Sequence, residues 1–401
     1  MIVFSRPPIE RIAFGGIPWY ALLIVAGIVI ALFIAIHEER RVHLPQDTAL
    51  DFALWAIPLA LVGARLYYVF FQWDYYVDDL WQIFNLRAGG MAIYGALIGG
   101  VLAAYIVARR KQISIFSILD IVAPGLVLAQ AIGRWGNYIN MEAYGFRLSN
   151  EALQFFPFAV EIPVGSVWYW HMATFFYESV WCLLVFAALW MLRRRTQRTG
   201  DTFLLYLLFY CAGRMVIEGM RDDSLTFFNE FVRISQIFSA IACMTVVILF
   251  LRRGVPQVQA KTDGSAALFR AGQSAYTPGR ILSVSACAAA FVLLFLGEFE
   301  RGAYAMLFTY SQILLLVLLV LALLSVLLML LREKTPALRL LPQLFTLVVG
   351  VGILIAGIGR VASDNTLYVS LRQLVCAFEM ISSGIALYAF ATPARQEEKG
   401  E

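Results

Sequence analysis

The sequence carries little charge. Only 14% of its 401 residues are Asp, Glu, Lys or Arg, whereas 61% are hydrophobic and the mean hydropathy is +0.76. Soluble globular domains carry about 25% charged residues. A helix needs about 20 apolar residues to cross a membrane, and the apolar residues here occur in blocks of that length. The composition therefore excludes a soluble enzyme and a disordered chain, and it predicts an integral membrane protein.

Cysteine and histidine are also sparse. The five cysteines all lie in apolar blocks without a CxxC spacing, which is typical of buried small hydrophobic side chains and excludes a disulfide-stapled secreted domain. The three histidines, His37, His43 and His171, are scattered at the ends of predicted helices and are expected at membrane interfaces. No metal site is predicted from either residue type.

The net charge of +4 is small, and the basic residues form short clusters between apolar blocks. Such clusters set the orientation of membrane helices, so nucleic acid is not predicted as a partner. Residues 1–19 carry two arginines, a glutamate and three prolines, and no cleavage site follows the first apolar block, so no signal peptide is expected.

Apolar blocks of spanning length predict an all-α, polytopic membrane protein with eleven transmembrane helices. The blocks are 17–36, 49–71, 91–108, 115–133, 169–192, 202–219, 235–251, 281–297, 306–331, 344–359 and 366–391.

The loops between these blocks differ in basic residues. Alternate loops on one side hold nineteen Lys and Arg residues, and those on the other side hold nine. Since cytoplasmic loops are the richer ones, the N-terminus is expected outside the cytoplasm and the C-terminus inside it. The outer loop 134–168 is long enough to form an external cap. Residues 253–280 contain Gly, Pro, Gln and Ser and are predicted to form a cytoplasmic linker. This linker divides a seven-helix core, 1–252, from a four-helix extension, 281–401.

Charged side chains inside membrane spans are costly and often functional. Arg65 lies near the outer end of the second block. It is either a functional residue or an arginine whose side chain merely extends to the outer lipid headgroups. The third block contains Gly95 and Gly99, a spacing that favours close helix packing. The stretch Gly133–Gly145 alternates glycines, amides and charges around Arg134, and its chemistry suits an anionic headgroup. The alternative is an ordinary polar loop where a helix leaves the membrane.

A second polar group ends the sixth block. Arg214 and Glu218 are four residues apart and share one helical face, which Arg221 roughly joins. One interpretation is an ion pair that holds helices together, and the other is a face directed into an outward-opening cavity. Glu178 in the fifth block is expected to be a structural hydrogen-bond partner. Arginines that converge on the outer side of a membrane cavity indicate an anionic lipid headgroup as the ligand.

The stretch Gly133-Arg134-Trp135-Gly136-Asn137-Tyr138-Ile139-Asn140-Met141-Glu142 resembles the signature of the bacterial prolipoprotein diacylglyceryl transferases. Other pieces follow in the order of that family. They are Trp19-Tyr20, Gly63-Ala64-Arg65, the glycine-rich third helix, Tyr177-Glu178, Gly200 and Arg214 through Arg221. The resemblance covers about residues 17–252. It implies transfer of the diacylglyceryl group of phosphatidylglycerol to the lipobox cysteine of a preprolipoprotein, the first step of lipoprotein maturation, at the outer leaflet of the bacterial cell membrane. It implies no cofactor.

The resemblance also implies roles for individual residues. The catalytic residues would be Arg134 and Arg214, which hold the phosphate, together with Glu142 and the residue at position 94. The substrate-binding residues would be Tyr20, Arg65, Asn137, Asn140, Gly145, Glu218 and Arg221. Many family members have histidine where this chain has Tyr94, and a phenol with a pKa near 10 is a poorer base at neutral pH.

Two other classes of function compete with this one. An anionic-lipid transporter or flippase would use the same arginine cavity without chemistry, but it requires a polar path to the cytoplasmic side, and the polar residues cluster outward. The other class is a non-catalytic scaffold. The extension 281–391 holds no matched motif, although Arg372 and Glu379 could form a packing pair or a separate polar site. A chain that ends near Gly254 is therefore expected to keep the activity.

Overall fold

A computed structural model describes most of the first 252 residues and part of the remainder. The described residues are 4–8, 10–13, 16–85, 89–194, 196, 198–222, 226–227, 232–252, 283–290, 292–293, 315, 317–318, 320 and 365–391. Two compact units divide the chain. Unit 1 comprises 1–9, 137–181 and 207–401, and unit 2 comprises 10–136 and 182–206.

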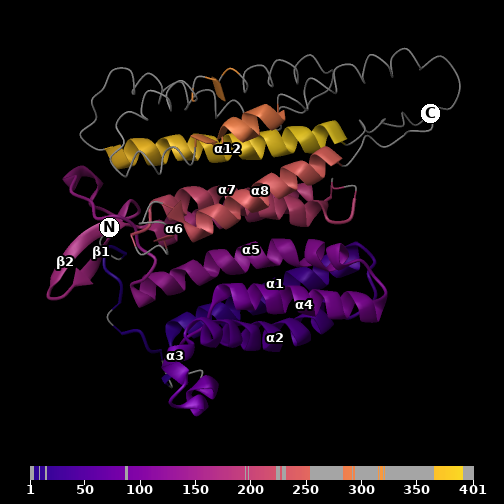
Figure 1. The fold of residues 1–401 in the computed structure, drawn as a ribbon, viewed down its shortest axis with the longest axis horizontal. Coiled ribbons are helices and arrows are strands. Elements are labelled where there is room, and N and C mark those ends of the chain that lie inside the picture. Colours follow the sequence, from indigo (N-terminus) through magenta and orange to yellow (C-terminus); the bar gives the residue numbers. More distant parts are fainter. Residues whose placement is uncertain are drawn as a thin grey trace, which may run out of the picture. The chain divides into compact units, whose positions relative to one another are not determined.

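The described chain is mostly helical, and six of its helices are long and apolar enough to cross a membrane (Figure 1). These are α1 (Trp19–Arg41), α2 (Thr48–Phe71), α4 (Ile93–Lys111), α5 (Ile115–Asn140), α6 (Thr174–Leu192) and α7 (Asp201–Gly219). The prediction of a multi-pass helical membrane protein is confirmed. Two further helices are α8 (Ile234–Arg252) and α12 (Asn365–Ala391). The expected helix 344–359, most of 306–331 and part of 281–297 lie outside the described residues.

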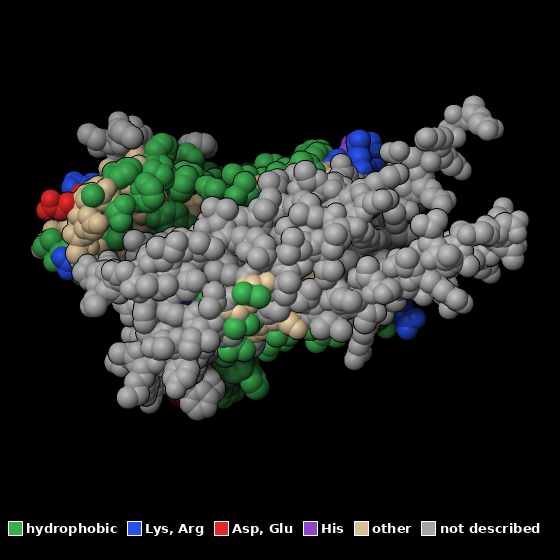
Figure 2. Space-filling view, turned by 90° about the horizontal axis from the view of Figure 1, so that it is seen from above, with side chains coloured by type: hydrophobic (Ala, Val, Ile, Leu, Met, Phe, Trp, Pro, Cys, Tyr) green, Lys and Arg blue, Asp and Glu red, His purple; other side chains and the backbone are tan. Residues whose placement is uncertain are grey.

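The lipid-facing character of these helices is visible on the surface. Large apolar side chains such as Leu54, Leu66, Phe70 and Ile98 are each more than half exposed. Figure 2 shows hydrophobic side chains over most of the described surface in that view. In water such a surface would be unstable, whereas in a bilayer it contacts the acyl chains.

Glycines let α2 and α4 approach closely in unit 2. A Cβ atom at Gly95 would collide with the backbone carbonyl of Gly63, and one at Gly99 would collide with that of Leu59. The packing predicted from the Gly95/Gly99 spacing is therefore confirmed. Between α2 and α4 the chain forms two short helices, α3 (Trp73–Tyr76) and η2 (Leu80–Phe84).

Helix α5 continues to Asn140, seven residues beyond the predicted end at 133. The prediction placed residues 134–140 in the external loop because the apolar pattern stops at Arg134. The helical hydrogen bonds do not need apolar side chains, and Gly136 permits the aromatic ring of Tyr20 to lie against the helix. The polar signature therefore occupies the last two turns of a helix rather than a loop.

The rest of the predicted cap contains β-structure, which the all-α prediction did not include. Strands β1 (Ala159–Val164) and β2 (Val167–Met172) pair antiparallel, with η4 (Glu151–Leu153) before them. The two-residue turn begins at Gly165, whose φ of +66° favours glycine. Residues 169–172, predicted as the start of a helix, belong to β2, and α6 begins at Thr174. The short strands β3 (Thr226–Phe227) and β4 (Val232–Arg233) form a second hairpin.

Candidate functional site

An ion-pair cluster joins α6 and α7 in unit 1. Arg214 Nη1 lies 2.8 Å from Glu178 Oε2, and Arg214 Nη2 lies 2.7 Å from Glu218 Oε2. Tyr210 donates a hydrogen bond to the other oxygen of Glu178 at 3.4 Å. The two carboxylates are buried, and the guanidinium between them compensates one of their two negative charges. Two acids on two helices thus fix the plane of the Arg214 guanidinium.

Glu218 has a second basic partner. Arg221 Nη1 lies 3.4 Å from Glu218 Oε2, three residues further along the chain. The shared face predicted for Arg214 and Glu218 from their spacing is confirmed by these contacts. Glu178, expected to be a structural hydrogen-bond partner, proves to be an ionic partner of Arg214. In the sequence, Glu178 stands out as a carboxylate within an apolar block. This indicates that it needs a partner, but the sequence does not show which residue that partner is.

A second cluster lies where α5 ends. Asn137 and Asn140 donate side-chain amide hydrogen bonds to Glu142 Oε1 at 2.8 and 3.4 Å. Met141 and Ala143, on either side of Glu142, have φ angles of 58° and 55°. This left-handed conformation costs non-glycine residues energy and is often found at functional sites. The backbone therefore turns sharply on both sides of Glu142, whose side chain is exposed.

Backbone pairing links these two clusters. Gly145 and Arg221 form an antiparallel bridge, Phe146 N donates to Met220 O at 3.1 Å, and Asp222 N donates to Tyr144 O at 3.3 Å. On its other side, Gly145 N donates to Met172 O at 2.9 Å. Unit 1 thus connects Glu142 and its asparagines to Arg221, Glu218 and Arg214 through one short stretch of paired backbone.

Four predicted site residues belong to unit 2. Tyr20 lies at the start of α1 and packs on Gly136 of α5, two residues after the half-buried Arg134. Tyr94, at the start of α4, lies near Tyr67 of α2, with ring centroids 6.1 Å apart. In this unit α1 and α5 therefore bring Tyr20 near the turn that carries Arg134.

Arg65 has a different environment from the one expected of a headgroup ligand. It is buried, and its five N–H groups donate to five backbone carbonyls at 2.5–3.2 Å. The acceptors are the carbonyls of Gln82, Ile83, Asn85, Gly89 and Gly90. Arg65 therefore holds the segment between α2 and α4 in place.

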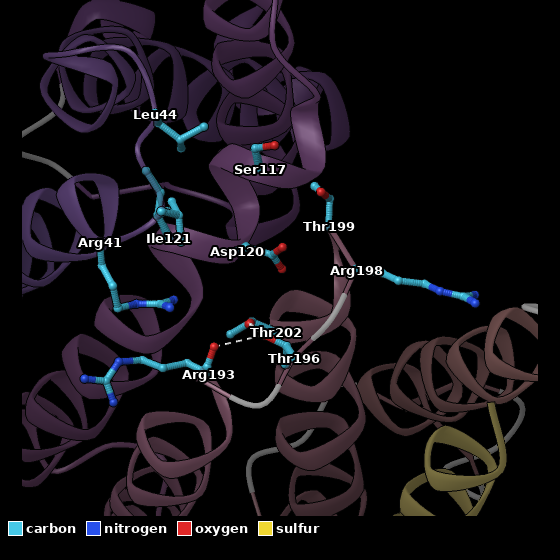
Figure 3. A pocket seen from close by; sticks show the side chains of 11 residues that line it. Arg41, Leu44, Ser117, Asp120, Ile121, Arg193, Thr196, Arg198, Thr199 and Thr202 are labelled. Atoms are coloured by element: carbon cyan, nitrogen blue, oxygen red, sulfur yellow. Dashed lines mark hydrogen bonds between the residues drawn. The ribbon is translucent and has the colours of Figure 1, made fainter. Parts of the chain in front are cut away.

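A pocket of about 240 Å³ lies at the other ends of α1 and α5 in unit 2 (Figure 3). Beside it the buried Glu38 accepts from Arg41 and Arg193, each at 2.8 Å. Asp120, which lines the pocket, accepts from the backbone N–H groups of Gly200 and Phe203 at the start of α7. Two guanidinium groups thus hold Glu38 and backbone N–H groups hold Asp120. The pocket is distant along both helices from Tyr20 and Arg134.

The five cysteines are all free and buried. This confirms the expectation that they act as small hydrophobic side chains.

These features define a multi-pass membrane protein with clusters of arginine, carboxylate and amide side chains at the ends of its helices. Residues 9–252 match the family model described as prolipoprotein diacylglyceryl transferase. The chain belongs to this family.

Curated relatives carry the name phosphatidylglycerol–prolipoprotein diacylglyceryl transferase. The protein of Enterococcus faecalis is 45% identical over 260 residues, which are 63% of this chain and 93% of that protein. The Oceanobacillus iheyensis protein is 40% identical over 263 residues, 63% and 91% of the two chains. The Streptococcus pneumoniae (strain JJA) protein is 46% identical over 228 residues, 56% and 86% of the two chains. The match to the family ends at residue 252, where the sequence predicted the core to end.

Proposed function

We propose that this protein transfers the diacylglyceryl group of phosphatidylglycerol to the lipobox cysteine of a preprolipoprotein. The cysteine sulfur forms a bond to the carbon of the diacylglyceryl group that carries the phosphate. The bond between that carbon and the phosphate oxygen breaks, its electron pair leaves with glycerol phosphate, and the thiol loses its proton. The products are a thioether and free glycerol phosphate, and the reaction needs no cofactor.

The observation that carries this proposal is the family match over residues 9–252. The linked clusters around Glu142 and Arg214 supply the polar groups that the reaction needs. A departing phosphate requires positive charge fixed in position, because preorganised donors stabilise developing charge without reorganising. Glu178 and Glu218 hold the Arg214 guanidinium in that way. None of the described contacts specifically favours the lipid transporter or the scaffold.

The roles we propose for the residues follow from their places. Arg134 and Arg214 bind the phosphate and stabilise the leaving group. Asn137, Asn140 and Gly145 shape the headgroup pocket, and Glu142 and Glu218 orient the basic and amide groups. Tyr20 and Arg221 contribute to lipid binding.

Arg65 contributes to lipid binding only indirectly in this proposal. Because all of its N–H groups donate to carbonyls of residues 82–90, it has no donor left for a phosphate. It acts by keeping the segment between α2 and α4 in shape.

The topology completes the proposal. Eleven helices cross the bacterial cell membrane, with the N-terminus outside and the C-terminus in the cytoplasm. Residues 1–252 form the seven-helix transferase core, 253–280 a cytoplasmic linker and 281–401 a four-helix extension. In this orientation α5 and α7 end, with Arg134 and Arg214 in their last turns, on the outer side, so the active site faces the outer leaflet. The nineteen basic residues in the alternate loops on the inner side support it.

Incubation of the purified full-length protein with phosphatidylglycerol and a lipobox peptide tests the activity. Mass spectrometry should show a peptide heavier by one diacylglyceryl group, and a peptide with serine in place of the cysteine should stay unmodified. Lipid movement between the leaflets of vesicles, with no thioether product, would favour the transporter and contradict the proposal.

Tyr94 tests how the thiol is activated. If arginines near the bound cysteine lower the pKa of the thiol directly, the phenol only donates a hydrogen bond. Tyr94→Phe should then reduce turnover about tenfold or less, the effect of one lost hydrogen bond of roughly 0.5–1.5 kcal/mol. Tyr94→His should remain active. A thousandfold loss of turnover with normal lipid binding would instead make Tyr94 a proton-transfer residue.

A further inference from the structure

Helix α12 lies beyond the family match and yet packs on the core helices of unit 1. In Figure 1 it runs beside α8 and α7. Gly384 of α12 leaves no room for a side chain against Leu208 of α7, and the ring of Phe378 contacts that of Trp181 of α6 edge to face, with centroids 5.7 Å apart. Helix α12 therefore packs against α6 and α7 through these side chains.

Trp181 transmits this contact to the backbone of α7. Its Nε1 donates to the carbonyl oxygen of Phe209 at 3.0 Å. Its indole lies so close to Gly213 that any side chain at that position would collide with it. The indole therefore lies directly against the residue that precedes Arg214, and the same indole contacts Phe378.

One turn of α6 separates Trp181 from Glu178. Residues three apart on a helix share a face, so α6 touches α7 through two adjacent layers. In one layer Trp181 meets Phe209 and Gly213, and in the other Glu178 meets Tyr210 and Arg214. A shift of the indole moves α7 relative to α6, and this alters the distance between Glu178 and Arg214.

We infer that Phe378 of the C-terminal extension is a positioning residue for Arg214. This inference rests on the proposed transferase function. Phe378 confines the Trp181 indole, the indole fixes the backbone at Gly213, and that backbone sets the guanidinium between Glu178 and Glu218. The extension thereby supports catalysis from outside the family core. A chain that ends near Gly254 lacks this support, so the expectation that it keeps full activity is replaced by an expected partial loss.

Phe378→Ala tests the inference in the full-length protein. It opens space beside Trp181, so kcat should fall about tenfold while KM for phosphatidylglycerol changes less than about twofold, because a small misplacement of Arg214 affects the transition state most. Met380→Ala is the matched control, since Met380 is a large side chain that is fully buried in the same helix. It should lower thermal stability and leave kcat unchanged.

Trp181, which contacts Phe378, allows a second and independent test. Trp181→Phe removes the hydrogen bond to Phe209 and should also lower kcat about tenfold. The double variant Phe378→Ala/Trp181→Phe should be no slower than about the worse single variant, because both changes interrupt one chain of contacts. Losses that multiply would overturn the inference, as would a normal kcat for Phe378→Ala. An inactive wild-type protein would instead contradict the proposed function.

Discussion

Arg134→Ala and Arg214→Ala are each expected to reduce diacylglyceryl transfer at least a hundredfold. Removal of one preorganised donor from a site that stabilises developing negative charge typically costs about 10²–10³ in rate. The two arginines lie in the last turns of α5 and α7 and are both proposed to hold the departing phosphate. Initial rates of thioether formation, measured at saturating phosphatidylglycerol, give the effect on kcat.

A second variant at position 214 is needed because Arg214→Ala also affects stability. Arg214→Ala leaves Glu178 and Glu218 buried without their shared partner, a change that costs several kcal/mol of stability when a buried ion pair is broken. Arg214→Lys keeps the charge but cannot reach both carboxylates with a planar fork, so it should stay folded and still lose more than about tenfold in kcat.

Arg109→Ala is the control for both arginines. Arg109 is exposed near the end of α4, and its side chain bonds to Tyr105 of the same helix, so its removal should leave the rate unchanged. Near-normal turnover by Arg134→Ala and Arg214→Ala, with both proteins inserted in the membrane, would contradict their assignment.

Much of the fold was predictable because the membrane imposes it. A lipid environment requires helices whose backbone groups are satisfied internally, so apolar length alone placed α1, α2, α4 and α7 within a few residues of their observed bounds. The same criterion failed at α5, because the hydropathy pattern ends at Arg134 whereas the helical hydrogen bonds continue to Asn140. It also missed β1 and β2, since a short hairpin gives a weak sequence pattern.

The site was predictable in its residue types but only partly in its contacts. A spacing of four residues was sufficient to pair Arg214 with Glu218, because helical geometry determines which residues share a face. The link from Glu178 to Arg214 joins two helices, and no local spacing contains it. Arg65 shows the same limit: a buried arginine implies partners, but only the tertiary structure identifies them as the carbonyls of residues 82–90. Phe378 had no signal at all, since one phenylalanine in an apolar helix is indistinguishable from its neighbours.

Gly145→Ala is expected to lower kcat for transfer about a hundredfold with a smaller effect on folding. A Cβ atom at position 145 would lie 2.7 Å from Met172 Cβ and 2.8 Å from the carbonyl oxygen of Met220. Neither atom is the end of a flexible side chain, so the backbone itself must move. The displaced segments are β2 on one side and residues 220–222 on the other.

That displacement acts on both polar clusters at once. Residues 144–146 pair with residues 220–222, and this pairing connects Glu142 and its two asparagines to Arg221. If the clusters work as one site, separating them by even an ångström should lower kcat by about a hundredfold. Gly100→Ala is the matched control, because its Cβ meets nothing within 4 Å and alanine favours a helix. A Gly145→Ala protein with the wild-type rate would show that the paired backbone only joins the strands and does not set the geometry of the site.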